Sequence, residues 1–197
     1  MRNNSNRLPL LLLLLCGLTV VQRQLPLGTH NLSALGALAI VSGVYFRPFW
    51  LALAFPLGTR LLTDCLLQYQ TGFGFYSSLG FDYAAYALIV LLACWVRPQR
   101  FAGNASTGVF AGAATGFVSA TIFFLMSNFG AWLLPMNGEY LYPQTLQGLF
   151  SCYRNGIPFA RGTFGGDMLF TPIYLLAVQM LLKPVPNLPE STVRTAE

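Results

Sequence analysis

SNFGAWLLPMNGEYLYPQTLQGLFSCYRNGIPFARGTFGGD, residues 127–167, is the stretch around which the rest of the chain is organised. It holds the largest concentration of polar, aromatic and turn-forming residues in a chain that is otherwise mostly apolar. Asn128 and Trp132 stand one helical turn apart at the end of a long apolar segment, and Tyr142 follows a break that begins at Pro135. We therefore expect the specific binding groups of this protein to be concentrated here.

The composition indicates an integral membrane protein. The chain has 197 residues, of which 55% are hydrophobic and only 9% are charged, whereas about 25% of the residues in an ordinary soluble domain are charged. The basic residues are scattered singly, and no run of Lys and Arg could follow a phosphate backbone. We therefore expect the lipid bilayer as the surroundings of the chain, and no binding to nucleic acid.

The residues that metal sites and common enzymes require are missing. His30 is the only histidine, and none of the four cysteines forms a CxxC pair, so a ligand set for zinc or an iron–sulfur cluster is not expected. The sequence contains no GxSxG or HExxH motif and no phosphate-binding glycine loop with a lysine. We accordingly expect no catalytic residues, no metal and no cofactor.

The apolar segments predict an all-α membrane protein, a bundle of about six transmembrane helices in a single domain over residues 1–183. The expected spans are residues 8–21, 33–46, 49–67, 83–96, 107–134 and 166–182. The polar tail at residues 184–197 is expected to be disordered. The first segment, behind Arg2 and Arg7, also fits a signal peptide, and a retained helix is favoured because no small-x-small cleavage site follows it.

The distribution of basic residues predicts that both termini are cytoplasmic. Six spans put both ends on one side, and seven basic residues then lie inside: Arg2, Arg7, Arg47, Arg97, Arg100, Lys183 and Arg194. Three lie outside: Arg23, Arg154 and Arg161. The outer face is then shared by residues 127–167, the 68–80 loop and the loop that contains His30. A solute would enter from this face.

Small residues in the fifth segment indicate close helix packing. Gly108, Gly112, Gly116 and Ala120 recur at every fourth position. This is an extended small-xxx-small pattern, which lets two helices approach closely in a bilayer. Contact with another helix of the same chain is the favoured interpretation, and a seam between copies is the alternative.

Arg60 and Asp64 are an opposite-charge pair within the third apolar segment. A spacing of four places them on one helix face, close enough to bridge, and ionisable residues inside a span suggest function. They either fix helix packing as a neutralised pair or contact a solute. Asp167 is interpreted as a charge at a helix N-terminus. The candidate substrate-binding residues are Arg60, Asp64, Asn128, Trp132 and Tyr142.

The chain resembles an uncharacterised bacterial family of small six-span membrane proteins. The resemblance is carried by HNLSALGALAIVSGVYF (residues 30–46), by the following span with Asp64, and by SNFGAW and YPQTLQGLFSCYRNGIPF within residues 127–167. That family is in turn similar to the substrate-binding S components of energy-coupling-factor vitamin transporters. The resemblance implies an S-component-like fold in the bacterial cytoplasmic membrane, a solute pocket near the outer face and an energising membrane partner.

Two functions from different classes follow from these observations. The first is a solute-binding subunit of an importer, with an outward-facing pocket lined by Asn128, Trp132 and Tyr142. The second is a structural or scaffold membrane protein without transport activity, comparable to small cell-shape factors. The first predicts a cavity of roughly 300 Å³ or more, whereas the second predicts that the same side chains pack into a solid bundle or point into lipid.

Overall fold

The protein is all-α over the residues that the computed structural model describes, which are 7–24, 32–46, 48–96 and 105–182. These residues form six α-helices: α1 (Arg7–Gln24), α2 (Leu35–Tyr45), α3 (Phe49–Thr71), α4 (Leu79–Trp95), α5 (Ala105–Leu133) and α6 (Leu146–Leu182). Within them the only β-type pairing is an isolated bridge between Met136 and Glu139. The predicted all-α class is therefore confirmed for the described part of the chain.

Three helices, α3, α5 and α6, are long and apolar enough to cross a membrane. The other three fall short of the roughly 20 residues that a full crossing needs. The shortest, α2, has 11 residues and is about 17 Å long at 1.5 Å per residue. The expectation of six segments that are each long enough to span is thus corrected to three.

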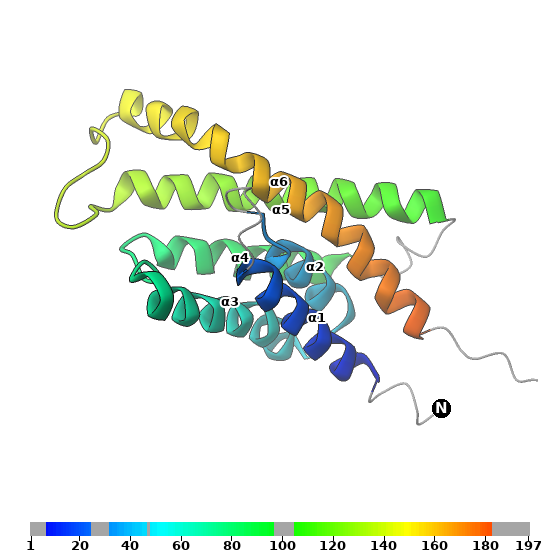
Figure 1. The fold of residues 1–197 in the computed structure, drawn as a ribbon. Helices are drawn as coiled ribbons and strands as arrows, with labels where there is room; N and C mark the ends of the chain where they lie inside the picture. Colours follow the sequence, from blue (N-terminus) through cyan, green and yellow to red (C-terminus); the bar gives the residue numbers. More distant parts are fainter. Residues whose placement is uncertain (1–6, 25–31, 47, 97–104, 183–197) are drawn as a thin grey trace, which may run out of the picture.

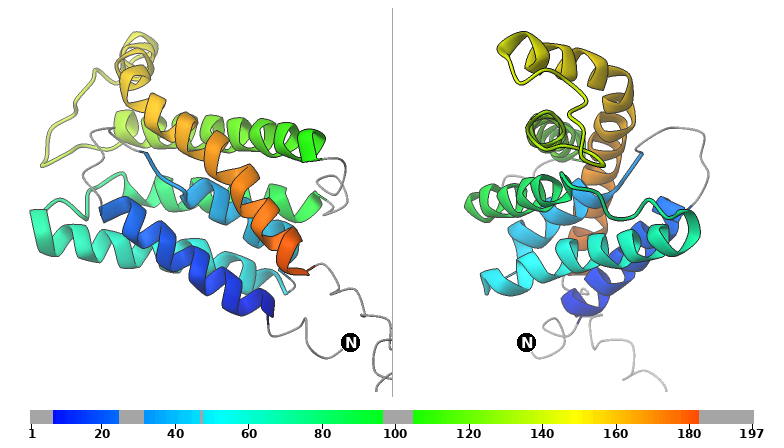
Figure 2. Two further views of the ribbon diagram at one scale, coloured as in Figure 1. Left: turned by 45° about the vertical axis from the view of Figure 1, so that its right-hand side comes forward. Right: turned by 90° about the vertical axis from the view of Figure 1, so that its left-hand side faces the viewer.

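The helices run in alternating directions along one long axis (Figures 1 and 2). The start of α1 and the end of α6 lie at one end of the bundle, and the turns at residues 72–78 and 134–145 lie at the other. α2 lies in the middle and contacts all five other helices. Every residue of α2 from Leu35 to Val44 is buried, so this short helix forms the centre of the core.

The glycine stripe of α5 faces α6 of the same chain. A Cβ atom at Gly112 would lie 2.9 Å from the Cα atom of Pro172, and one at Gly116 would lie 2.3 Å from the carbonyl oxygen of Asp167. Gly108 is also buried. Glycine is required at the first two positions because a side chain would meet backbone atoms of the neighbouring helix.

α6 begins at Leu146, so the start predicted for the last span at residue 166 is wrong. Thr145 initiates the helix, because its hydroxyl oxygen accepts a hydrogen bond from the Gly148 N–H at 3.1 Å. The helix continues through Pro158 and bends in its first half (Figure 2). Much of the segment expected to be irregular is therefore helical.

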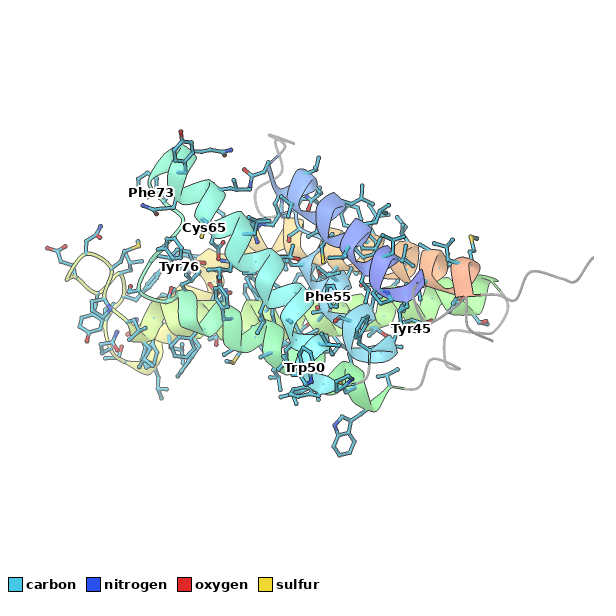
Figure 3. All side chains as sticks on the ribbon, turned by 90° about the horizontal axis from the view of Figure 1, so that it is seen from below. Tyr45, Trp50, Phe55, Cys65, Phe73 and Tyr76 are labelled. Carbon is cyan, nitrogen blue, oxygen red and sulfur yellow. The ribbon has the colours of Figure 1, made fainter. Side chains whose placement is uncertain are left out.

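The surface of the bundle is apolar, as expected for helices in lipid. Trp50 and Phe73 lie at the two ends of the α3 region (Figure 3) and are 65% and 80% exposed. Exposed aromatic residues near helix ends are typical of membrane interfaces. α1 belongs to the bundle, because Leu12 and Leu15 are buried in the shared core.

Several sequence predictions concern residues outside the described ranges. These are the polar tail at 184–197, the loop with His30, and most of the basic residues expected on the cytoplasmic side: Arg2, Arg47, Arg97, Arg100, Lys183 and Arg194. The three basic residues expected in external connections all lie on helices instead. Arg23 is in α1, and Arg154 and Arg161 are in α6.

Candidate functional site

A cavity of about 550 Å³ lies in the half of the bundle that carries the 72–78 and 134–145 turns. The charged side chains and the tyrosines of its lining come from α1, α3, the turn after α3, and α4: Arg23, Arg60, Asp64, Tyr76, Asp82 and Tyr86. α5 and α6 contribute an aromatic and apolar lining together with a few polar groups. Its apolar members are Phe123, Phe124, Ala131, Gly156, Phe159 and Ala160.

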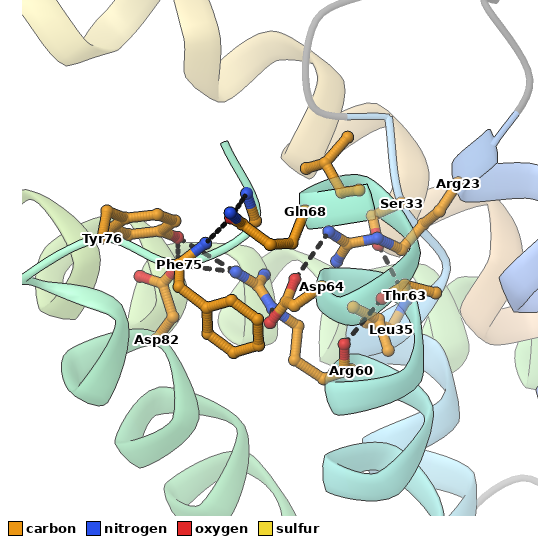
Figure 4. Close-up of polar contacts among 12 residues, drawn as sticks. Arg23, Ser33, Leu35, Arg60, Thr63, Asp64, Gln68, Phe75, Tyr76 and Asp82 are labelled. Atoms are coloured by element: carbon orange, nitrogen blue, oxygen red, sulfur yellow. Dashed lines mark hydrogen bonds and ion pairs between the residues drawn. The ribbon is translucent and has the colours of Figure 1, made fainter. Parts of the chain in front are cut away.

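Arg60 is the centre of a polar network in this cavity (Figure 4). Its Nε atom donates to Oδ2 of Asp64 at 2.7 Å, so the two residues bridge, and its Nη2 atom donates to Oδ2 of Asp82 at 3.1 Å. Nη2 also donates to the Tyr76 hydroxyl at 3.0 Å, and the guanidinium carbon lies 6.0 Å from the centre of the Tyr86 ring. The network therefore ties α3 to α4 through buried charges.

Arg23, in the last turn of α1, completes the charge balance. Its Nη2 atom lies 3.5 Å from Oδ1 of Asp64, and its side chain is 16% exposed, compared with 6% for Arg60. Tyr83 also donates to Asp64, at 3.1 Å from Oδ2. The charged residues that line the cavity are thus two arginines and two aspartates, with a formal sum of zero. Arg23 has the longest ion pair among them.

The turn after α3 holds Tyr76 over the network. Gly72 ends α3 in the left-handed conformation, with φ 76°, and the Gln68 side chain accepts a hydrogen bond from the Gly74 N–H at 2.9 Å. Burial and the neighbouring Asp82 carboxylate raise the pKa of the Tyr76 hydroxyl. Tyr76 therefore keeps its proton and donates it in a hydrogen bond to Asp82.

The segment that enters α2 is fixed by α1. Gln22 donates from Nε2 to the Leu32 carbonyl at 2.6 Å, and its Oε1 accepts from the Ala34 N–H at 3.2 Å. Ser33, which lines the cavity, accepts a hydrogen bond from the Leu35 N–H at 3.2 Å. The end of α1 and the start of α2 thus form one wall of the site.

Asp167 caps α2 from a different helix. Its carboxylate accepts hydrogen bonds from the backbone N–H groups of Gly36 and Ala37, and Ser119 donates to its Oδ2 at 2.7 Å. A negative charge at a helix N-terminus is favourable because the helix dipole is positive there. The role predicted for Asp167 at the start of its own helix is therefore corrected. It lies in the middle of α6 and serves the first turn of α2.

A family model described as a family of unknown function, DUF6580, matches residues 3–188. The chain belongs to DUF6580. The expected membership of an uncharacterised family is thereby confirmed. No curated protein and no solved structure matches the chain.

Among the predicted site residues, the cavity of this DUF6580 protein brings together Arg60, Asp64 and Asn128. Asn128 uses its Nδ2 atom to donate to the Phe124 carbonyl at 2.8 Å. Trp132 and Tyr142 are not part of the lining, which corrects the expectation for both. The reason is position along the bundle, because the lining on α5 ends at Ala131.

Trp132 belongs to the turn beyond the cavity. Its indole Nε1 donates to the Pro143 carbonyl at 3.0 Å, and its own carbonyl accepts from Gln144 at 2.6 Å. Trp132 therefore closes the hairpin between α5 and α6. The exposed Tyr140 lies in the same turn.

Sequence reasoning missed Arg23, Tyr76 and Asp82 as members of the site. Arg23 was assigned to an external connector, and Asp82 stood just before a predicted span. The sequence does contain a sign that could have identified Asp82. It is an acidic residue at the edge of an apolar segment, and a buried carboxylate requires a partner. The DUF6580 structure has no group of three His, Cys, Asp or Glu suited to a metal ion within its described residues.

Proposed function

We propose that this DUF6580 protein binds a small solute within the membrane and acts as the S-component-like, substrate-binding subunit of an importer. The observation that carries the proposal is the cavity of about 550 Å³ lined by buried charged groups. Ligand sites generally have volumes of roughly 300 Å³ or more. Charged side chains inside a membrane protein are expensive and commonly mark solute pathways.

The proposal includes six crossings of the bacterial cytoplasmic membrane, with both termini cytoplasmic. The alternating directions of the helices support it, because the cavity half then faces outward, opposite the ends of α1 and α6. α1 and α4 are only slightly short, and a bilayer accommodates such a mismatch by thinning locally. The 11-residue α2 would cross together with the residues that precede it in the chain.

An importer of this kind also needs an energising membrane partner, and the resemblance to S components is the reason to expect one. The glycine stripe of α5 is occupied by α6. Docking to such a partner would therefore use another surface of the bundle.

The proposal is tested by identifying small molecules that remain bound to the purified protein, using mass spectrometry. Ala131→Phe places a ring in the cavity, and Leu125→Phe, at an exposed position on the same helix outside the lining, is the matched control. We expect a co-purifying small molecule that is present in the wild type and the control and is lost from Ala131→Phe. If the bound molecules are the same in both variants, or if none binds, the scaffold function is favoured instead.

A further inference from the structure

We infer that the solute is a zwitterion with an apolar, ring-sized body, bound with its anionic group at Arg23 and its cationic group at Asp82. This inference rests on the proposed function and specifies the substrate class of the same cavity. Three features of the lining carry it: the charge balance, two incompletely used charged groups, and the aromatic side chains of α5 and α6.

The charge balance favours a ligand without net charge. Two arginines and two aspartates line the cavity, and their formal charges cancel. Arg60, Asp64 and Asp82 are only 5%, 1% and 4% exposed. A net charge added to surroundings that solvate it poorly would have no counter-charge, which is unfavourable.

Judged by the contacts of the described residues, Arg23 is the positive group of the lining with unused hydrogen-bonding capacity. A guanidinium carries five N–H donors, and within the described part of the chain Arg23 has one partner, Oδ1 of Asp64 at 3.5 Å. Arg60, by contrast, is engaged by two carboxylates and a tyrosine hydroxyl. The N-terminus of α2 is also occupied, because Asp167 caps it. Arg23 is therefore where a ligand carboxylate would bind in the two-pronged geometry that arginine prefers.

Asp82 is the negative group with an unused oxygen. Its Oδ2 accepts from Arg60 and Tyr76, whereas its Oδ1 has no hydrogen-bond partner among the residues that the structure covers. Asp82 itself lines the cavity. Buried carboxylate oxygens are normally hydrogen-bonded, and a ligand ammonium would supply the donor.

The apolar, ring-sized body of the ligand is inferred from the side chains with which α5 and α6 line the cavity. Phe123, Phe124 and Phe159 line the cavity there. Aromatic side chains pack favourably against another ring through stacked or edge-to-face contacts. A ligand with a ring and two opposite charges would therefore match both parts of the lining.

The ligand class is tested with three compounds that share one ring: tryptophan, with both charges; tryptamine, with the positive charge only; and indole-3-propionate, with the negative charge only. Binding to the purified full chain in detergent is measured by titration calorimetry at neutral pH. We expect tryptophan to bind at least about tenfold more tightly than either singly charged compound. Equal or tighter binding of a singly charged compound, or no binding of any of the three, would overturn the inference.

Arg23→Gln tests the assignment of the anionic group. Asp64 keeps Arg60 and Tyr83 as partners in this variant, so the fold should be retained. Circular dichroism and gel filtration check this. We expect the preference for tryptophan over tryptamine to disappear in Arg23→Gln and to persist in Arg154→Gln, an exposed position on α6. A preserved preference in Arg23→Gln would overturn the assignment.

Failure of this inference is distinguishable from failure of the proposed function. A co-purified molecule that is lost from Ala131→Phe supports solute binding whatever its charge. If that molecule carries a single net charge, the zwitterion is ruled out and the solute-binding function stands.

Discussion

Arg60 acts as a shared cation for two buried carboxylates, Asp64 and Asp82. The i,i+4 spacing within α3 explains the first contact, and the packing of α4 against α3 supplies the second. Removing one member of a buried ion pair is more damaging than removing both, because the remaining charge loses its compensation. Since Arg23 and Asp64 also pair, the charge-balanced change is to remove Arg60 together with Asp82.

Arg60→Gln should lower the free energy of unfolding by about 3–5 kcal/mol, because it leaves two carboxylates with only Arg23 nearby. The double change Arg60→Gln with Asp82→Asn should be less destabilising than Arg60→Gln alone, because one carboxylate is then neutral and Arg23 still pairs with Asp64. Thermal unfolding in detergent measures both. Arg154→Gln, on the exposed surface, should change stability by no more than about 0.5 kcal/mol. Additive effects of the two changes would show that Arg60 and Asp82 are not coupled.

α2 is an element whose position depends on its neighbours. By itself it is shorter than a bilayer crossing, it is buried on all sides, and the N–H groups of its first turn at Gly36 and Ala37 are capped by Asp167 of α6, a residue far away in sequence. A Cβ atom at Gly36 would lie 2.0 Å from Oδ2 of Asp167. The absence of a side chain at Gly36 is thus what allows the carboxylate to reach the backbone of α2.

Asp167→Ala should expose the amides of Gly36 and Ala37 to faster hydrogen exchange, because it removes the acceptor at the start of α2. The expected loss of stability is about 1–3 kcal/mol, the range for buried donors left without partners. Asp167→Asn keeps an acceptor oxygen and should be less disruptive. Exchange rates at residues 35–38, followed by mass spectrometry, provide the measurement. Unchanged exchange in Asp167→Ala would show that the cap does not stabilise α2.

The contact between α5 and α6 is tested with one substitution at two glycines. Gly116→Ala should destabilise the protein by about 1–3 kcal/mol, because the added methyl group would meet the Asp167 backbone. Gly58→Ala in α3 has no atom within 4 Å of the new Cβ, and alanine favours a helix by about 1 kcal/mol relative to glycine. Gly58→Ala should therefore leave the melting temperature unchanged or raise it. Equal effects at the two positions would contradict the close contact.

In the whole molecule, the cavity lies toward one end of the bundle, and the start of α1 and the end of α6 lie at the other end. The turns at residues 72–78 and 134–145 lie beside the cavity. The predicted orientation rests on seven basic residues expected inside and three expected outside. The three expected outside, Arg23, Arg154 and Arg161, lie on α1 or α6 and not in external loops. Cytoplasmic termini therefore stay a prediction that accessibility must test.

Labelling of a single cysteine with a membrane-impermeant maleimide in intact cells tests the topology. Glu139→Cys is a suitable site, because Glu139 is exposed in the turn and, unlike Gly138 with φ +88°, has no left-handed backbone conformation. The four native cysteines are first replaced by serine. We expect labelling of Glu139→Cys from outside, and labelling of Ser191→Cys only after the cells are permeabilised. The reverse pattern would place the cavity half in the cytoplasm.

The sequence alone determined the all-α class, the membrane character and the pairing of Arg60 with Asp64. Each of these depends on composition or on spacing within one helix. Asn128 lies in the lining of the cavity, whereas Trp132 and Tyr142 lie beyond Ala131, the last residue that α5 contributes to the lining. A role of Asn128 in solute binding stays a prediction. Only the tertiary structure joined Arg23, Asp82 and Asp167 to their partners, since these contacts connect residues on different helices. The polar groups that define the site are separated in sequence, and packing around the short, buried α2 is what brings them together.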